Sequence, residues 1–279
     1  MLNELKGLYK ISRPLTTLTG GLAVLLGGYV AGTGAWGQVA LAILATWFIT
    51  AAANAWNDYQ DIEIDKINQP KRPLPSGMVS PRSALVYSLV MTAISILLAA
   101  FINPIAFGVA IGSAAMLYLY SWRLKSTVLM GNAIVAAVSA MSAIFGGIAA
   151  GNARPTLWLA AIIASAIMGR EVLKTLADYE GDLRQRCRTV ATVWGRRAAR
   201  IVLYILGAAT LVLMMIPYML DVYEPVYALI VALGVYPVLF YVLVRVTRDR
   251  TGPQLEKLSQ LMKYDFMVWF LAVLLGAAA

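Results

Sequence analysis

Nine stretches of apolar residues follow one another along this chain, each close to the roughly 20 residues that an α-helix needs to cross a bilayer. Hydrophobic residues make up 60% of the 279 residues, and charged residues make up only 13%. A soluble domain cannot bury so many runs of this length, so the sequence predicts an all-α, polytopic membrane protein with a single integral-membrane domain over residues 1–279. The nine predicted spans are residues 15–32, 39–56, 83–101, 105–120, 128–150, 157–176, 198–219, 225–244 and 261–278.

Charged residues gather in alternate connections between these stretches. Every Lys and Arg except Arg154 lies on one set of segments or at the adjoining span ends: the N-terminal segment and residues 59–82, 121–127, 177–197 and 245–260. The connections on the other side are short, and the last of them carries Asp221 and Glu224. Because Lys and Arg stay on the cytoplasmic side of a membrane protein, we expect a multi-pass protein of the cell membrane with a cytoplasmic N-terminus and, after nine spans, an outside C-terminus.

The remaining composition excludes several classes of protein. The net charge of +9 is mainly a topology signal, with attraction to anionic membrane lipids as a secondary effect. No basic helix or RNA-binding motif is present, so we expect no nucleic-acid partner, and nothing indicates an obligate protein partner. The absence of histidine excludes imidazole acid–base chemistry and His-ligated haem. Cys187 is the single cysteine, which excludes an internal disulfide.

The first residues, MLNELKGLYKISRP, lack the short apolar core of a signal peptide, so we expect none. Leu2, Leu5 and Tyr9 recur at helical spacing beside Lys6 and Lys10, which predicts a short amphipathic helix lying on the membrane surface. Glycine pairs inside three of the spans predict close helix packing: residues 20–21, 27–28 and 146–147.

The stretch from residue 54 to residue 77 is polar and follows the second predicted span. At 100° per residue, five of its side chains fall within an arc of roughly 100° on a continuous helix, while Glu63 points to the opposite side. These five are Asn54, Asn57, Asp58, Asp61 and Asp65. Carboxylates on one stripe repel each other, and a cation among them relieves that repulsion. Oxygen ligands without His or Cys suit Mg²⁺ or Ca²⁺; the alternative is a solvated acidic helix end.

A second polar stretch follows the sixth predicted span. Glu171, Lys174, Asp178 and Asp182 again share one stripe if the helix persists, although Gly181 is expected to end it just before Asp182. Both stretches end even-numbered spans, so both open to the cytoplasmic face. Two carboxylate clusters beside cations are what a site for Mg²⁺-bound diphosphate needs, since metal ions and cations together make diphosphate a good leaving group.

Several motifs together resemble one known family. Asn57-Asp58-x-x-Asp61-x-x-x-Asp65 is followed by K-R-P-L-P-S-G at residues 71–77, and Asp178-x-x-x-Asp182 stands in the second stretch. Further matches are Arg13-Pro14, Tyr120-Ser121-x-x-x-Lys125 and Gly131-Asn132. On these motifs, over essentially its whole length, the chain resembles the UbiA superfamily of intramembrane prenyltransferases. The resemblance implies nine helices around a central cavity that opens to the cytoplasmic face and laterally to lipid.

The resemblance also implies roles for individual residues. Mg²⁺ or diphosphate binding is expected at Asn57, Asp61, Asp65, Asp178 and Asp182, with Asp58 and Asn54 beside them. Arg72 and Lys125 are expected to contact the diphosphate of a polyprenyl donor, with Ser121 close by, and Lys174 is a third cation from its place on the stripe. For Arg72 and Lys125 the alternative role is anchoring at the cytoplasmic interface.

The implied reaction is ionisation of the allylic C–O bond, followed by attack of the acceptor on the allyl cation. Tyr118 and Tyr120 are candidates to stabilise that cation, or else interfacial anchors. The base is Asp182, Asp65 or the departing diphosphate. A cation-coupled transporter is a remote alternative, because transporter ion sites lie near the bilayer midplane, whereas these carboxylates lie at the ends of spans.

The acceptor is expected to be a lipid. The second stretch is most similar to the branch of the family that adds a second geranylgeranyl chain to geranylgeranylglyceryl phosphate in archaeal lipid synthesis. The phosphate of such an acceptor is expected to meet Arg184, Arg186, Arg188 or Arg13. An aromatic acceptor, such as 4-hydroxybenzoate or another quinone precursor, is the alternative.

Overall fold

The computed structural model describes residues 2–184, 186–246 and 251–277; the side chains of residues 2, 67 and 68 lie outside the description. Every named element within these ranges is a helix. The chain forms two compact units, and α7 contributes to both. Unit 1 comprises Met1–Leu124 and Ser142–Arg154, and unit 2 comprises Lys125–Met141 and Pro155–Ala279. The prediction of a single domain remains a prediction.

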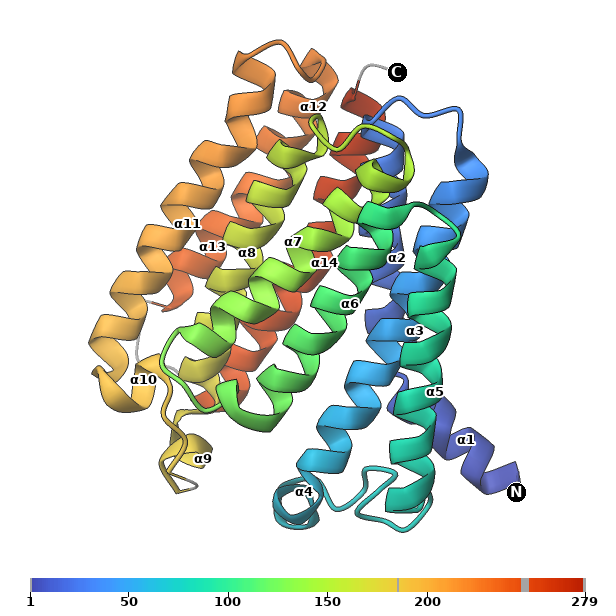
Figure 1. Cartoon of the computed structure of the whole chain (residues 1–279). Helices are drawn as coiled ribbons and strands as arrows, with labels where there is room; N and C mark the ends of the chain where they lie inside the picture. Colours follow the sequence, from blue (N-terminus) through green and yellow to red (C-terminus); the bar gives the residue numbers. More distant parts are fainter. Residues whose placement is uncertain (1, 185, 247–250, 278–279) are drawn as a thin grey trace. The chain divides into compact units, whose positions relative to one another are not determined.

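Unit 1 contains the N-terminal helices (Figure 1). They are α1 (Leu2–Ile11), α2 (Pro14–Val30), α3 (Trp36–Gln60), α4 (Ile62–Asn68), α5 (Pro81–Ala100), α6 (Pro104–Leu119), the π-helix η1 (Tyr120–Leu124) and the C-terminal part of α7 (Met130–Ala149). Local chemistry sets several helix starts. Pro81 and Pro104 occupy first turns, where a missing N–H costs nothing, and Ser80 and Asn103 cap the following amides.

The core of unit 1 forms where α3 packs against α2 and α5. Close packing depends on glycine: a Cβ on Gly27 would clash with the carbonyl oxygen of Ala143, and a Cβ on Gly146 would clash with that of Val24. The predicted packing role of the 27–28 and 146–147 pairs is therefore confirmed at these two positions. The predicted N-terminal helix is also confirmed as α1.

Unit 2 contains the remaining helices. They are the N-terminal part of α7, α8 (Thr156–Ala177), α9 (Tyr179–Arg184), α10 (Val190–Val193), α11 (Gly195–Met219), α12 (Pro225–Ile230), the π-helix η2 (Val231–Val235), α13 (Tyr236–Val246) and α14 (Gly252–Gly276). α8 packs against α11 and α14, and their buried side chains form the core of this unit. Packing against both α11 and α14 thus sets the position of α8 and of the second motif, which begins at its C-terminal end.

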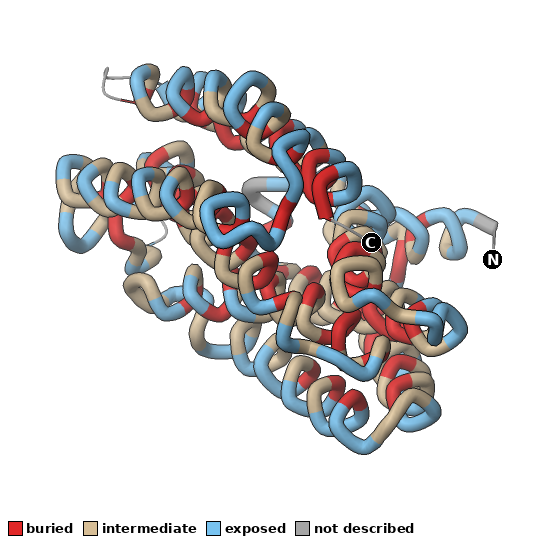
Figure 2. Tube along the Cα trace, turned by 90° about the horizontal axis from the view of Figure 1, so that it is seen from above, coloured by how far each residue is buried: buried red, intermediate tan, exposed pale blue. Residues whose placement is uncertain are grey.

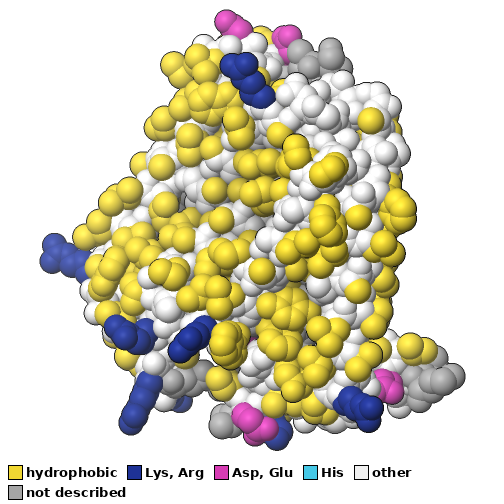
Figure 3. Space-filling view, in the orientation of Figure 1, with side chains coloured by type: hydrophobic (Ala, Val, Ile, Leu, Met, Phe, Trp, Pro, Cys, Tyr) yellow, Lys and Arg dark blue, Asp and Glu magenta, His cyan; other side chains and the backbone are white. Residues whose placement is uncertain are grey.

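The prediction of an all-α, multi-pass membrane protein is confirmed. Eight helices of the described chain are long and apolar enough to cross a membrane, and they correspond to the second to ninth predicted spans. The first predicted span is α2, which is apolar but has only 17 residues, so the count of nine stays a prediction. Single helices in Figure 2 carry buried residues on one side and exposed residues on the other, and hydrophobic side chains are spread widely over the face drawn in Figure 3. Exposed apolar residues such as Leu97, at 58% exposure, suit contact with lipid.

One helix boundary differs clearly from the prediction. The ninth span was expected to start at residue 261, whereas α14 begins at Gly252. Thr251 and Gln254 form a capping box, and Pro253 lies in the first turn. Hydropathy marks only the apolar part of a helix, whereas capping starts this helix in a polar segment.

Candidate active site

The aspartates of the first motif lie at the C-terminal end of α3 and in α4, on a side of these helices that is buried in unit 1. Asp58, Asp61 and Asp65 are exposed by only 3%, 9% and 5%. The expected continuous helix is wrong in detail, because α3 ends at Gln60 and Asp61 adopts a non-helical conformation before α4. Backbone bonds of helical spacing nevertheless continue through the break, from the Asp65 amide to the Asp61 carbonyl at 2.8 Å.

The side opposite the stripe is solvated, as predicted. The Glu63 carboxylate is 76% exposed and accepts a hydrogen bond from Lys66 Nζ at 2.7 Å. The stripe pattern therefore distinguishes correctly between buried and exposed acids.

Two arginines form ion pairs with the buried carboxylates. Arg13 Nη2 donates to Asp58 Oδ1, and Arg13 itself has φ 49° and ψ 67° at the junction of α1 and α2. Arg72 Nη1 lies 2.6 Å from Asp65 Oδ2 and 3.8 Å from Asp58 Oδ1. Both arginines were predicted to contact phosphate, and neither was predicted to bind these carboxylates. A diphosphate at this motif would therefore share two cations that already neutralise the stripe.

Asn54 and Asn57 have different surroundings. Asn54 Nδ2 donates to the Ser12 carbonyl at 3.2 Å, so it holds the chain beside Arg13. Asn57 Nδ2 donates to Ser121 Oγ at 3.5 Å, so two predicted site residues are brought together. Asn54 is therefore placed to position an arginine of the site.

Tyr118 has a clear packing role. Its hydroxyl lies 2.6 Å from Ser88 Oγ and 2.8 Å from Thr92 Oγ1, both on α5. Its ring stacks on Trp56 with centroids 4.8 Å apart. Tyr120 is half-buried at the start of η1. The predicted role of either ring next to an allyl cation stays a prediction.

The second motif, in unit 2, repeats the local design of the first. α8 ends at Ala177, Asp178 has φ −89° and ψ 3°, and the short helix α9 follows. Asp61 has nearly the same conformation, with φ −91° and ψ 4°. The amide of Asp182 donates to the carbonyl of Asp178 at 2.9 Å, as Asp65 does to Asp61. The expectation that Gly181 ends the helix is wrong, because the break falls at Asp178.

This correspondence places Lys174 where the first motif has Asn57, four residues before the break. Lys174 Nζ lies 3.1 Å from Glu171 Oε1 and 3.2 Å from Oε2. Arg170 Nη1 lies 3.5 Å from the same Glu171 Oε1. Glu171 is thus a functional candidate that the sequence prediction placed on the second stripe without giving it a role, although its position next to Arg170 and three residues before Lys174 indicates an ion pair.

Asp182 is half-buried, and loss of water raises the pKa of its carboxyl from 3.8 to about 6. The charge of Asp178 adds to this rise, whereas a hydrogen bond from Thr189 and the charge of Lys125 oppose it. The structure therefore brings Lys125 and the second motif together within unit 2. Thr189 carried no signal in the sequence.

The oxygen ligands that the two motifs offer fit Mg²⁺ bound together with substrate phosphates. In the part of the chain that the structure describes, no three His, Cys, Asp or Glu side chains gather into a metal cage. Both motifs offer carboxylate oxygens, and neither includes a His or Cys ligand. Mg²⁺ is usually held by one or two carboxylates plus phosphate oxygens, so the carboxylates of either motif suit an ion that arrives with diphosphate.

Three of the four arginines predicted for an acceptor phosphate lie on the surface, and the fourth, Arg13, bonds to Asp58. Arg184 ends α9, Arg186 has φ 55°, and these two and Arg188 are exposed. Exposed arginines are surrounded by water, which weakens each contact to an anion. Their predicted role stays a prediction.

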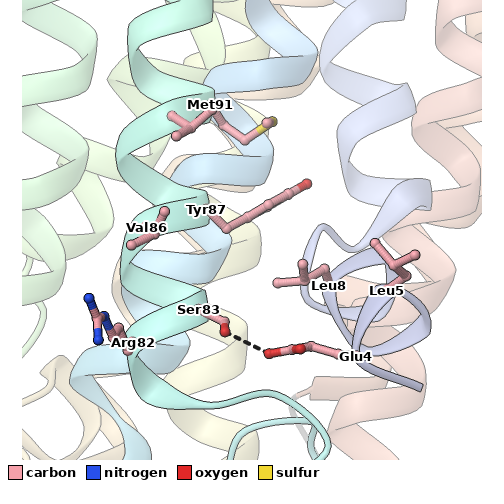
Figure 4. Close-up of a pocket in the computed structure, with 9 residues that line it drawn as sticks. Glu4, Leu5, Leu8, Arg82, Ser83, Val86, Tyr87 and Met91 are labelled. Atoms are coloured by element: carbon pink, nitrogen blue, oxygen red, sulfur yellow. Dashed lines mark hydrogen bonds between the residues drawn. The ribbon is translucent and has the colours of Figure 1, made fainter. Parts of the chain in front are cut away.

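A cavity of about 470 Å³ lies elsewhere in unit 1, between α1 and α5. Its walls include Leu5, Leu8 and Tyr87, and at one end Ser83 Oγ donates to Glu4 Oε1 at 2.6 Å (Figure 4). None of the predicted site residues lines this cavity. The site is therefore defined by its charged side chains rather than by this cavity.

Comparison with known proteins identifies the family. The model of the UbiA prenyltransferase family matches residues 15–278. A digeranylgeranylglyceryl phosphate synthase of Halobacterium salinarum is 37% identical over 262 residues, which cover 92% of this chain and 94% of that relative. A solved structure from work on the biosynthesis of digeranylgeranylglyceryl phosphate synthase in membranes aligns with a TM-score of 0.82, at 27% identity over 99% of both chains. A UbiA homologue from Archaeoglobus fulgidus bound to GPP and Mg²⁺ shares the fold, with a TM-score of 0.70 and 20% identity over 94% of this chain and 99% of that one. The chain therefore belongs to the UbiA prenyltransferase family and is a multi-pass membrane prenyltransferase.

Proposed function

We propose that this protein transfers a geranylgeranyl group from geranylgeranyl diphosphate to geranylgeranylglyceryl phosphate, with Mg²⁺ as cofactor. The observation that carries the proposal is the 37% identity, over 92% of the chain, to a relative named digeranylgeranylglyceryl phosphate synthase. The product in that name carries two geranylgeranyl groups on one glyceryl phosphate. Removal of one group gives the acceptor, and the same group on diphosphate is the donor.

Each Asp motif offers carboxylates for Mg²⁺ that is bound to the donor diphosphate. The proposed Mg²⁺ ligands are Asn57, Asp61, Asp65, Asp178 and Asp182. The Archaeoglobus fulgidus homologue, solved with GPP and Mg²⁺, supports this choice of ion. When bound, Mg²⁺ neutralises diphosphate oxygens and so makes diphosphate a better leaving group.

The cations of the chain hold the remaining diphosphate oxygens. Arg72, Lys125 and Lys174 have these roles, with Ser121 and Asp58 beside them. Arg72 bonds to Asp65 and Lys174 bonds to Glu171, so both cations are already oriented before a substrate arrives. Preorganised cations stabilise the negative charge that develops on a departing diphosphate.

The transfer replaces one C–O bond by another. The allylic C–O bond breaks, diphosphate leaves with the electron pair, and the glyceryl hydroxyl oxygen bonds to the allyl cation. Tyr118 and Tyr120 are the candidates to face that cation, and Tyr118 also stacks on Trp56.

The hydroxyl proton passes to a carboxylate or to the departing diphosphate. Asp65 is a weak candidate because it accepts a hydrogen bond from Arg72 at 2.6 Å. Without Mg²⁺ the pKa of the Asp182 carboxyl is raised to about 6, closer to the value that suits a base at neutral pH, so Asp182 can serve as the base only while it is not a Mg²⁺ ligand. We therefore assign the proton to Asp182 or to diphosphate.

The proposed orientation follows from the charges of the connections. The N-terminus and both Asp motifs face the cytoplasm, the C-terminus lies outside, and the enzyme works in the cell membrane without an obligate protein partner. Accessibility of single cysteines introduced at Thr33 and Ser126, each in a Cys187→Ser background, tests this orientation, since the two positions lie in connections expected on opposite sides.

A product assay by mass spectrometry tests the proposed function. Purified protein receives Mg²⁺, geranylgeranyl diphosphate, and geranylgeranylglyceryl phosphate in competition with 4-hydroxybenzoate. We expect the doubly prenylated lipid, and we expect EDTA to abolish it. A prenylated aromatic product alone would overturn the proposed acceptor and retain the prenyl transfer.

A further inference from the structure

A half-buried lysine on α14 lies beside another cation in unit 2. Arg170 of α8 donates from Nε to the carbonyl of Ser259 at 3.3 Å, which brings its guanidinium to α14. Lys263 lies one helical turn after Ser259 on the same face of α14, and the charges of Arg170 and Lys263 act on each other. Two positive side chains are therefore neighbours inside the candidate membrane spans α8 and α14.

The acids of the described chain do not balance these cations. Glu171 lies 3.5 Å from Arg170 and 3.1 Å from Lys174, and no carboxylate of the described residues pairs with Lys263. Glu256 lies two turns earlier on α14, where it accepts a hydrogen bond from Gln260. A charged side chain inside a membrane span is costly without a counter-charge, so Lys263 lacks the anion that its position needs.

A buried hydroxyl on the same turn also lacks a partner. Ser259 is 0% exposed, and its Oγ has no hydrogen-bond partner in the described structure. Nearly all buried polar groups are hydrogen-bonded, so an orphaned hydroxyl calls for a ligand or a water. A hydroxyl, a guanidinium and an ammonium together are suitable donors for a phosphate group.

We propose that Arg170, Ser259 and Lys263 bind the phosphate of the glyceryl phosphate acceptor. The inference rests on the proposed function and names the acceptor subsite. Glu171 is bonded to both Arg170 and Lys174, so one carboxylate separates the acceptor cations from the lysine assigned to diphosphate. The exposed arginines after α9 are then not needed for acceptor binding.

Binding without donor or Mg²⁺ tests the subsite directly. The ligands are geranylgeranylglyceryl phosphate and the same lipid without phosphate, added to the detergent-purified full chain. Lys263→Gln should weaken binding of the phosphorylated lipid about tenfold or more, the loss of one hydrogen bond to a charged group, and should leave the other lipid unaffected. Lys257→Gln, at an exposed lysine on the same helix, is the matched control and should change neither. Because Lys263 pairs with no described carboxylate and lies beside the charge of Arg170, its substitution should not lower the unfolding temperature.

Steady-state kinetics separate the two sources of phosphate. Lys263→Gln should raise the KM for the acceptor and leave the KM for geranylgeranyl diphosphate unchanged. Three results would each overturn the subsite. The first is a raised KM for geranylgeranyl diphosphate alone, and the second is equal affinity of wild type and Lys263→Gln for geranylgeranylglyceryl phosphate. The third is a wild-type protein that binds the lipid with and without phosphate equally well. Phosphate-selective binding that Lys263→Gln removes, without any product, would support the subsite and refute the proposed function. Product formation with an identical acceptor KM in wild type and Lys263→Gln would support the proposed function and refute the subsite.

Discussion

Two ion pairs near the first motif have almost the same length and very different burial. Arg72 lies 2.6 Å from Asp65, whose side chain is 7% exposed, and Lys66 lies 2.7 Å from Glu63, whose side chain is 76% exposed. Loss of one partner from a fully buried pair costs about 3–5 kcal/mol, whereas an exposed pair contributes about 0–1 kcal/mol. The Arg72 side chain is 35% exposed, so Arg72→Gln should cost about 2 kcal/mol, an intermediate value.

The free energy of unfolding in mixed micelles measures this difference. Lys66→Gln is the matched control and should cost less than about 0.5 kcal/mol. Asp65→Asn combined with Arg72→Gln should cost less than the sum of the two single changes, because both remove the same pair. Equal losses for Arg72→Gln and Lys66→Gln would refute the argument that burial makes the first pair stronger.

Three further predictions concern proton binding, helix packing and a tyrosine hydroxyl. The Asp182 pKa is raised from 3.8 to about 6, so ionised Asp182 destabilises the folded protein above about pH 6 and this cost is absent below about pH 4. Asp182→Asn should therefore flatten the pH dependence of the unfolding free energy over that range, and an unchanged slope would contradict it. Gly146→Ala should cost about 1–3 kcal/mol through its clash with the Val24 carbonyl, whereas Gly112→Ala, with nothing within 4 Å, should be neutral or stabilising in the same unfolding measurement. Tyr118→Phe should cost about 1 kcal/mol and retain most turnover, since it loses only the hydroxyl; loss of turnover without loss of stability would give Tyr118 a chemical role.

Periodicity and hydropathy predicted the features that depend on local sequence. Burial of Asp58 and Asp65 and exposure of Glu63 follow from 100° per residue, and eight spans follow from apolar runs of bilayer length. The break at Asp61 was not predictable, because its backbone bonds keep helical spacing and the sequence contains no Gly or Pro there.

Contacts between distant segments carried no comparable signal. Arg13 and Asp58 are 45 residues apart, and Arg170 and Ser259 are 89 residues apart. Both contacts depend on tertiary packing, which a single sequence does not encode as a pattern. Arg72 was recognised by its motif, but its bond to Asp65 gives it a second role that the motif did not reveal.

Prenyl transfer by variants with one substitution each tests the central claim that the residues of the two Asp motifs are required for the Mg²⁺-dependent reaction. The measurement is the initial rate of product formation from geranylgeranyl diphosphate and geranylgeranylglyceryl phosphate in detergent, with Mg²⁺ present. Asp61→Ala and Asp182→Ala should each abolish product, whereas Glu63→Ala, at an exposed acid next to the first motif, should retain the wild-type rate. Full turnover by both Asp61→Ala and Asp182→Ala would contradict the assignment of the site.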